Sequence, residues 1–210
     1  EPAIVHAVSL KISILAALCM RSAKSSVLLC AFTGLGYIFT SNKIAAKVLK
    51  FVVTLLLRTL LSNQRYWGVV QNREDLEFLQ KIKGGCSNRL LLIRGSGVDV
   101  DFFSYSDLPQ EKISRVLFPA RLLADKGIHE FVNAARHILS QRSDVEFLLA
   151  GGLDLSNPSA VSRSDIESWV EEGIVTWLGE VQDMRSLYQR SNIICLPSYR
   201  EGLPKSLLEA

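Results

Sequence analysis

The sequence predicts an α/β fold with two parallel β-sheets. Short apolar runs alternate with longer segments of helical periodicity along almost the whole chain. The alternation is interrupted once, by a polar stretch at residues 100–112 that contains Pro109, and then starts again. Because strand–helix–strand order implies parallel crossover units, we expect one sheet on each side of this stretch. We therefore predict a first domain at residues 1–99, a linker at residues 100–113 and a second domain at residues 114–210.

The composition excludes several classes of protein. Apolar residues make up 48% of the 210 residues, which is enough for a real core. The net charge of +3 is too small to indicate a nucleic-acid-binding protein. The four cysteines are scattered and form no CxxC pair, so we expect reduced thiols in a cytoplasmic protein, with no metal and no cofactor.

The apolar runs are interrupted by lysines and arginines, so we expect no membrane-spanning helix. The chain begins on Glu1 without a basic leader, which argues against a signal peptide. It also lacks an initial Met and stops within a predicted helix. We expect it to be an internal part of a longer protein.

The first half contains four apolar runs that predict strands and three periodic segments that predict helices. The strands are expected at residues 4–8, 27–32, 66–70 and 89–93, and the helices at residues 10–23, 43–61 and 73–83. In the first helix, Ile14, Leu15 and Leu18 form the expected apolar face. Asn72 precedes the third helix and is a suitable N-cap.

The helix at residues 43–61 has one basic stripe. Its cations Lys43, Lys47, Lys50 and Arg58 fall within about one quadrant, and the other positions are almost wholly apolar. One interpretation is a core helix with one solvated side. The other is a face that meets anionic lipid headgroups or a lipid-linked diphosphate.

The second half repeats the alternation of strands and helices. Strands are expected at residues 115–120, 145–150, 174–178 and 193–196, and helices at residues 128–141, 162–172 and 183–190. Ser162 and Asp165 have the spacing of a capping box.

The last segment, residues 197–210, combines two carboxylates with a glycine and a proline. It follows an apolar run, so we expect a buried strand, a tight loop and the start of a helix. Such a loop presents unpaired N–H groups, which suit phosphate. Pro204 is expected near the helix start, which places Glu201 in the loop and Glu209 in the helix.

Several charged residues and glycines follow predicted strands, and loops at the carboxyl ends of parallel strands are where ligands bind. Three of these residues are Arg121, Lys126 and Gly151. Two cations five positions apart suit a diphosphate, and carboxylates accept hydrogen bonds from sugar hydroxyls. From the residues alone we predict a phosphorylated, hydroxyl-rich ligand. The alternative for Arg121 and Lys126 is an ordinary solvated loop.

These residues also carry a resemblance to a known family. Residues 121–127, 147–152 and 197–204, with Glu209, closely resemble the nucleotide-sugar half of family 4 glycosyltransferases. Residues in the first half resemble the end of the acceptor domain of the same family, at positions 4–6, 33–36, 71–72 and 93–99. The resemblance implies a retaining enzyme of the GT-B type, with two Rossmann-like domains facing a cleft and both incomplete here. Bacterial enzymes that extend undecaprenyl-diphosphate-linked sugars are the most similar group.

The resemblance also implies roles for individual residues on the donor side. Arg121 and Lys126 would neutralise the donor diphosphate in place of a metal. Glu201 would bind hydroxyls of the transferred sugar, and Glu209 would bind the ribose. The residues implied to bind the nucleotide-sugar are Arg121, Lys126, Gly151, Glu201, Gly202, Leu203 and Glu209.

The acceptor side differs from the family pattern at some positions. The implied residues there are Thr33, Gly34 and Gly36, and Thr33 stands where many relatives carry a histidine. His6 matches a common family histidine, so it is a candidate for catalysis, with a structural role as the alternative. Ala120 replaces a frequent glycine before Arg121.

The expected function is transfer of a sugar from a nucleotide-sugar, UDP-sugar in particular, to a lipid-linked or polysaccharide acceptor with retention. An epimerase on the same architecture is an alternative, against which the spacing of Glu201 and Glu209 argues. An inactive, truncated nucleotide-binding module is another. We expect a cytoplasmic location, with peripheral contact at the inner face of the plasma membrane through Lys43, Lys47, Lys50 and Arg58.

Overall fold

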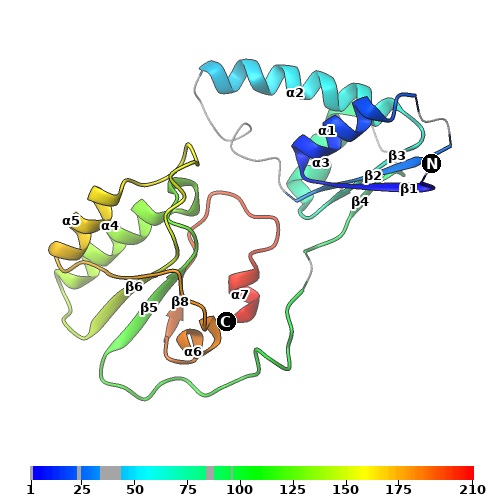
Figure 1. Cartoon of the computed structure of the whole chain (residues 1–210). Coiled ribbons are helices and arrows are strands. Elements are labelled where there is room, and N and C mark those ends of the chain that lie inside the picture. The colour runs from blue at the N-terminus through cyan, green and yellow to red at the C-terminus, as the bar shows by residue number, and fades with distance from the viewer. Residues whose placement is uncertain (1, 23–24, 34–43, 84–87, 96) are drawn as a thin grey trace. The chain divides into compact units, whose positions relative to one another are not determined.

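The computed structural model describes residues 2–22, 25–33, 44–83, 88–95 and 97–210. The chain divides into two compact units. The first comprises Glu1–Ser96 with Glu201–Leu203, and the second Gly97–Arg200 with Pro204–Ala210. Each unit contains a four-stranded parallel sheet with helices (Figure 1). The predicted α/β fold with two parallel sheets is confirmed.

The first unit has its strands in sequence order across the sheet, β1-β2-β3-β4. The strands are β1 (Ile4–Val8), β2 (Val27–Phe32), β3 (Tyr66–Val70) and β4 (Leu90–Leu92), and the helices are α1 (Leu10–Cys19), α2 (Ile44–Ser62) and α3 (Arg73–Lys83). Asn72 caps α3 as predicted, because its Oδ1 accepts the Asp75 N–H at 2.7 Å.

The helices of the first unit pack on one face of its sheet. Leu28, Cys30 and Phe32 of β2 point to that face and are buried in a core formed with all three helices. The alternating positions point to the other face, where Ile4 and Ile93 are 65% and 53% exposed. No helix of the described chain covers this second face.

The prediction for α1 is wrong in two respects. The helix ends at Cys19 rather than at residue 23, and it buries Ser13 and Ala17. Of the predicted apolar face, Ile14 does pack against the core, but Leu15 and Leu18 are each 48% exposed. Small side chains let the helix lie close to the sheet, and the Ser13 hydroxyl donates to the Ala7 carbonyl at 3.4 Å. The side of α1 that packs against the sheet is therefore the one that carries small residues.

The interpretation of α2 as a core helix with one solvated basic side is wrong for much of its apolar surface. Val53, Leu57 and Leu60 are buried, whereas Phe51 and Leu55 are 72% and 55% exposed. The helix lies on one face of the sheet, so only one side of it can be covered there. Of the predicted basic stripe, Lys47 and Arg58 are exposed and Lys50 is half-buried. Lys43 lies outside the described residues.

The second unit has the strand order β7-β6-β5-β8. Its strands are β5 (Ser114–Pro119), β6 (Val145–Ala150), β7 (Thr176–Gly179) and β8 (Ile193–Ile194). Its helices are η2 (Ala124–Lys126), α4 (Ile128–Leu139), α5 (Arg163–Glu171), α6 (Met184–Gln189) and α7 (Lys205–Glu209). Ser162 caps α5 through the Asp165 N–H, as the capping-box spacing predicts.

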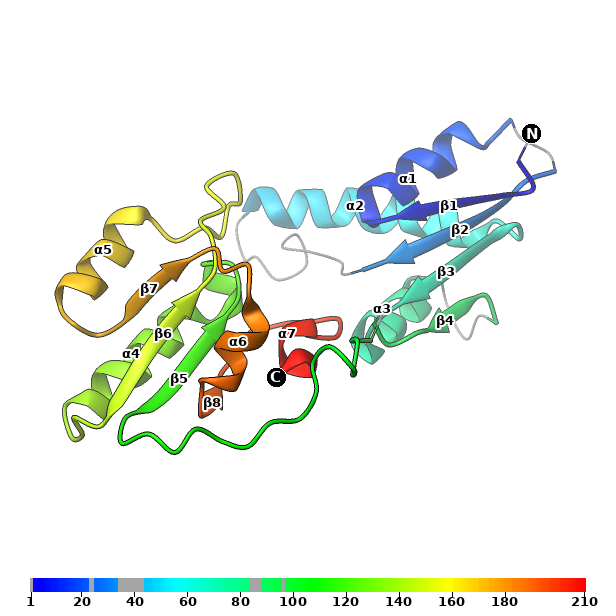
Figure 2. The ribbon, with the colours of Figure 1, turned by 60° about the horizontal axis from the view of Figure 1, so that its bottom comes forward.

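Both faces of the second sheet are covered (Figure 2). On one face, Phe118 packs against Phe131 of α4 with ring centroids 5.3 Å apart. On the other face, Leu117 and Leu148 pack with Tyr188 of α6. A parallel sheet is normally buried on both sides, and this unit follows that rule.

Within the described ranges, we find no helix that combines the length and the apolar character required to cross a bilayer.

Candidate functional site

In the second unit, two loops contact each other at the carboxyl edge of the sheet. Gly151 directly follows β6, and a Cβ atom at this position would collide with the carbonyl oxygen of Ala120. The Leu122 N–H also donates to the Gly152 carbonyl at 3.2 Å. The structure therefore brings together Arg121 and Gly151, two of the predicted site residues, at the level of their backbones.

The Arg121 side chain is held by an acidic partner. Its Nη1 lies 2.7 Å from Asp154 Oδ2, and the side chain is 60% exposed. The Ser156 hydroxyl and the Arg121 guanidinium lower the pKa of Asp154. The guanidinium is thus oriented by the loop after β6 and still open to a ligand. Sequence reasoning missed Asp154 because it lies in a polar loop without periodicity.

Lys126 ends the one-turn helix η2, just before Gly127. Gly127 has a φ angle of 78°, and a Cβ atom there would collide with the carbonyl oxygen of Pro197. The Tyr199 N–H donates to the Asp125 carbonyl at 3.1 Å. The loop after β5, which carries both predicted cations, is therefore fixed to the loop after β8 as well as to the loop after β6.

A side-chain hydrogen bond strengthens this junction. The Tyr199 hydroxyl donates to Glu130 in the first turn of α4, and this bond lowers the pKa of the Glu130 carboxyl. The segment after β8 is thus anchored to both ends of the Asp125–Glu130 region.

Glu209 lies in α7, and each of its carboxylate oxygens has a donor. Oε1 lies 3.4 Å from Lys205 Nζ, and Oε2 accepts from the Tyr188 hydroxyl at 3.3 Å. Tyr188 belongs to α6 and is buried; burial and the Glu209 carboxylate raise the pKa of its hydroxyl. The two donors fix the plane of the carboxylate. Sequence reasoning missed Tyr188, because no spacing links positions on two separate helices.

Glu201 lies in a loop and Glu209 in a helix, as predicted. Glu201, Gly202 and Leu203 belong to the first compact unit, whereas Arg121, Lys126, Gly151 and Glu209 belong to the second. Within the first unit, the Asn72 side-chain amide donates to the Glu201 carbonyl at 3.3 Å. The predicted donor-side residues are thus divided between the units.

On the first sheet, His6 and Thr33 line one cavity of about 260 Å³. Gln71, Ile93 and Gly95 line it too, and its floor is the sheet face that carries no helix. The structure therefore brings together the two predicted acceptor-side residues that it describes. Gly34 and Gly36 lie outside the described residues.

Among the residues that the structure describes, no group of three His, Cys, Asp or Glu side chains is arranged to hold a metal ion. The described cysteines Cys19, Cys30 and Cys195 are free. Burial raises the pKa of the Cys30 thiol to about 11, so this thiol stays protonated at neutral pH.

The second unit has a family match that agrees with its geometry. Residues 113–210 match the family described as glycosyl transferases group 1. Over these residues the chain is similar to a group 1 glycosyl transferase domain. The predicted resemblance to a glycosyltransferase family is confirmed, and the site loops of the second unit lie inside the matched residues.

Relatives of known activity cover more of the chain. It is 30% identical over 189 residues to the N,N'-diacetylbacillosaminyl-diphospho-undecaprenol alpha-1,3-N-acetylgalactosaminyltransferase of Campylobacter jejuni. This match includes 84% of the chain and 48% of the relative, so the chain spans about half of that enzyme. A second N-acetylgalactosaminyltransferase of that organism, named for an undecaprenol-linked substrate, is 34% identical over 103 residues, which are 48% of this chain and 27% of the relative.

Solved structures share the fold at low sequence identity. Anabaena Alr3699/HepE in complex with UDP and glucose has a TM-score of 0.73 at 16% identity, covering 99% of this chain and 56% of that one. WaaG, a glycosyltransferase involved in lipopolysaccharide biosynthesis, has a TM-score of 0.67 at 13% identity, covering 93% of this chain and 59% of that one. Both similarities extend over nearly the whole chain and support the predicted fold class.

Proposed function

We propose that the protein transfers a sugar from a UDP-sugar to a lipid-linked or polysaccharide acceptor, with retention of configuration. The observation that carries the proposal is the position of Arg121 and Lys126 in one loop, which backbone contacts fix to the loops after β6 and β8. The Campylobacter relatives are named for undecaprenol-linked acceptors, and HepE is named with UDP and glucose. These names support the choice of donor and acceptor class.

In this proposal the two cations act on the leaving group. When the bond between sugar and diphosphate breaks, negative charge accumulates on the diphosphate. Positive groups held in place before the reaction stabilise that charge more in the transition state than in the ground state. Asp154 orients the Arg121 guanidinium. The close packing of Gly127 on Pro197 fixes the backbone directly after Lys126. The cations thereby supply the charge that a metal ion supplies in other enzymes.

The carboxylates hold the two ends of the donor. Glu201 binds hydroxyls of the transferred sugar, and the backbone of Gly202 and Leu203 binds sugar or phosphate. Glu209 binds the ribose hydroxyls, because carboxylate oxygens accept hydrogen bonds and those of Glu209 are fixed by Tyr188 and Lys205.

The cavity of the first unit belongs to the acceptor side in this proposal. His6 and Thr33 line it together, and an imidazole can move a proton near neutral pH. His6 is therefore a candidate to accept the proton of the attacking hydroxyl.

We also place the protein in the cytoplasm, at the inner face of the plasma membrane, with Lys43, Lys47, Lys50 and Arg58 as the residues that contact anionic lipid.

Turnover tests the transfer itself. Release of UDP is measured from a panel of UDP-sugars, with and without undecaprenyl-diphosphate-linked sugars as acceptors. Acceptor-dependent release is expected. Conversion of one UDP-sugar into another without acceptor would indicate an epimerase, and UDP binding without any release would indicate an inactive binding module.

Calorimetry with UDP tests the site assignment. Lys126→Ala removes a charge-assisted contact to phosphate, which is typically worth about 1.5–3 kcal/mol, so we expect the Kd for UDP to rise by roughly 10- to 100-fold. Lys112→Ala is the matched control, because Lys112 is exposed and lies outside the site loops. Equal binding by the Lys126 variant and the unmodified protein would show that the cations do not hold the diphosphate.

A further inference from the structure

Helices α1 and α2 present apolar side chains on the sides that face away from the sheet. Ile12, Leu15 and Leu18 of α1 are each 48% exposed, and Phe51 and Leu55 of α2 are 72% and 55% exposed. A surface helix of a water-soluble domain normally carries polar residues on that side. A continuous exposed apolar patch indicates an interaction surface.

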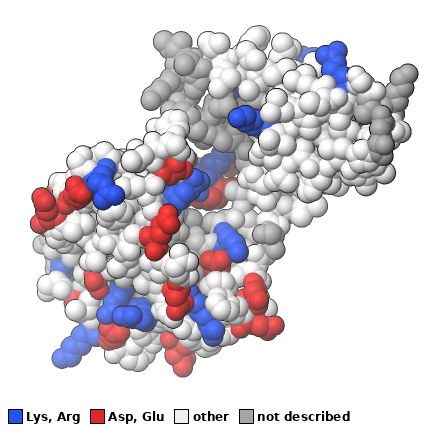
Figure 3. Space-filling view, viewed as in Figure 1, with Lys and Arg blue, Asp and Glu red and all other residues white. Residues whose placement is uncertain are grey.

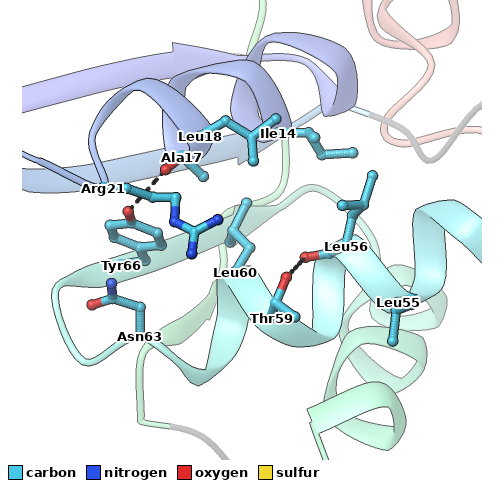
Figure 4. A pocket seen from close by; sticks show the side chains of 10 residues that line it. All are labelled: Ile14, Ala17, Leu18, Arg21, Leu55, Leu56, Thr59, Leu60, Asn63 and Tyr66. Atoms are coloured by element: carbon cyan, nitrogen blue, oxygen red, sulfur yellow. Dashed lines mark hydrogen bonds between the residues drawn. The ribbon is translucent and has the colours of Figure 1, made fainter.

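A groove runs between the two helices within this surface (Figure 4). It has a volume of about 390 Å³, and its walls include Ile14 and Leu18 of α1 and Leu56 and Leu60 of α2. Pockets of this size that are mostly apolar, with few polar groups, are typical of ligand sites.

The polar groups of the groove leave one charge for a ligand. The Thr59 hydroxyl donates to the Leu56 carbonyl at 2.7 Å, and the Tyr66 hydroxyl donates to the Ala17 carbonyl at 3.2 Å. Both hydroxyls therefore bond to the backbone of the helices that form the groove. Arg21 is exposed and lines the same groove, where it adds a permanent positive charge beside the apolar walls.

The charge of this part of the chain is one-sided. Residues 2–73 contain nine lysines and arginines and no aspartate or glutamate, although the chain as a whole has a net charge of only +3. In Figure 3 the visible surface of the first unit is white and blue, whereas that of the second unit mixes red with blue. Charge asymmetry of this kind favours an anionic partner.

We propose that the groove between α1 and α2 binds the acyl chain of an anionic membrane phospholipid, with the lipid phosphate at Arg21. The exposed apolar side chains around it then enter the headgroup region of the bilayer, and the helices lie along the membrane surface. This proposal rests on the membrane location given above and adds a defined lipid site, including α1, to the general contact through α2. A lipid is favoured over a protein partner because its uncharged chain suits the apolar walls of the groove and its single phosphate suits the single arginine that lines it.

A photoactivatable phosphatidylglycerol with the reactive group in its acyl chain tests the site. The intact chain is mixed with vesicles of phosphatidylcholine, with or without phosphatidylglycerol, and cross-linked peptides are identified by mass spectrometry. We expect cross-links in residues 14–21 and 55–66. Cross-links confined to other segments, or equal binding to both kinds of vesicle, would overturn the proposal.

Two variants separate the groove from the surrounding surface. Thr59→Phe fills the groove with an apolar ring, so it should abolish the cross-link while vesicle binding persists. Arg21→Gln should weaken binding to the anionic vesicles by about five-fold, since one cation near an anionic membrane is worth ~1 kcal/mol. Lys81→Gln, an exposed cation on α3, is the matched control and should change neither signal.

Three further measurements complete the test: the cross-link in the Thr59 variant, displacement of the lipid by competitors, and UDP binding. Persistence of the cross-link in the Thr59 variant would contradict the groove site, provided that its circular dichroism melting curve matches the unmodified protein. Displacement of the lipid by a polyprenyl diphosphate would assign the groove to an acceptor, and displacement by an acidic amphipathic peptide would assign it to a protein partner; either would overturn the proposal. UDP binding of the Thr59 variant should be unchanged, so a failure here is distinguishable from a failure of the proposed transfer.

Discussion

The two sheets of this protein differ in how their faces are covered. In the second unit, α4 and α5 cover one face and α6 covers the other, so that Phe118 and Leu117, neighbours on β5, are both fully buried. In the first unit, all described helices pack on one face. Adjacent residues of β4 show the result, since Leu90 is 7% exposed and Leu91 is 43% exposed.

This difference shows that strand pairing and strand composition do not by themselves determine burial. Both sheets are parallel and apolar on both faces, yet among the described residues only the second sheet has helices on both sides. The apolar face of the first sheet, with His6 among its residues, is therefore available to form the floor of a cavity. Both faces of the second sheet are covered by helices, and its candidate site residues lie in loops at the carboxyl edge.

The largest expected effect comes from the fully covered sheet. Phe118→Ala removes a ring that packs against Phe131, so we expect the free energy of unfolding of the second unit to fall by about 3–5 kcal/mol. Denaturant unfolding followed by hydrogen exchange resolves the two units. If protection from hydrogen exchange falls equally in the first unit, the two units unfold together. Their stabilities then cannot be compared separately.

The next effect tests the uncovered face directly. Leu90→Ala should cost about 2–4 kcal/mol, because Leu90 lies in the core of the first unit. Leu91→Ala points to the other face and should cost less than about 0.5 kcal/mol, as surface substitutions do. Each residue is the control for the other, and similar losses in urea unfolding would show that the second face is covered after all.

A smaller effect is expected in the site of the second unit. Tyr188→Phe keeps the buried ring and removes the hydroxyl that holds Glu209. One hydrogen bond is worth about 0.5–1.5 kcal/mol, so the Kd for UDP should rise by roughly two- to ten-fold.

A specific control accompanies this variant. The loss should disappear with 2′,3′-dideoxy-UDP, because Tyr188 acts through the carboxylate that we assign to the ribose. Tyr66→Phe, which removes a buried hydroxyl in the first unit, should leave UDP binding unchanged. An equal loss with both nucleotides would mean that Tyr188 only supports the fold.

The smallest effect concerns pH. The Ser156 hydroxyl and Arg121 lower the folded-state pKa of Asp154, so its contribution to stability is present above the unfolded pKa of about 4 and is lost as pH falls through the folded value. The Asp154 side chain is 26% exposed and its partner Arg121 is 60% exposed, so solvent screens the pair and a small change is expected. Titration of the Asp154 carboxyl by NMR should show the lowered pKa, and Arg121→Gln should shift it upwards; no shift would exclude the ion pair in solution.

Much of the fold follows from local signals in the sequence. Capping residues predict α3 and α5 because a cap depends only on nearby backbone N–H groups. The buried side of α1 could not be predicted. Its apolar residues surround the helix, and the choice of Ser13 and Ala17 as the inner side depends on the shape of the sheet.

Spacing in the sequence predicts part of the candidate site, and tertiary packing supplies contacts that spacing does not report. The short loop between Arg121 and Lys126 predicts two cations for one ligand, and the structure places both residues in the loop after β5. Asp154 and Tyr188 act on site residues from elements distant in the chain, and no local pattern marks such partners. Division of Glu201 and Glu209 between two compact units is likewise a property of the folded chain.

The close packing of Gly127 on Pro197 has a consequence for protein engineering. Because a Cβ atom at position 127 would meet the carbonyl oxygen of Pro197, the backbone of each loop is shaped by the other. If the loop after β5 were transplanted alone from a related protein, it would lack the surface that it packs against here. Grafts should therefore exchange residues 121–127 and 197–199 as a pair.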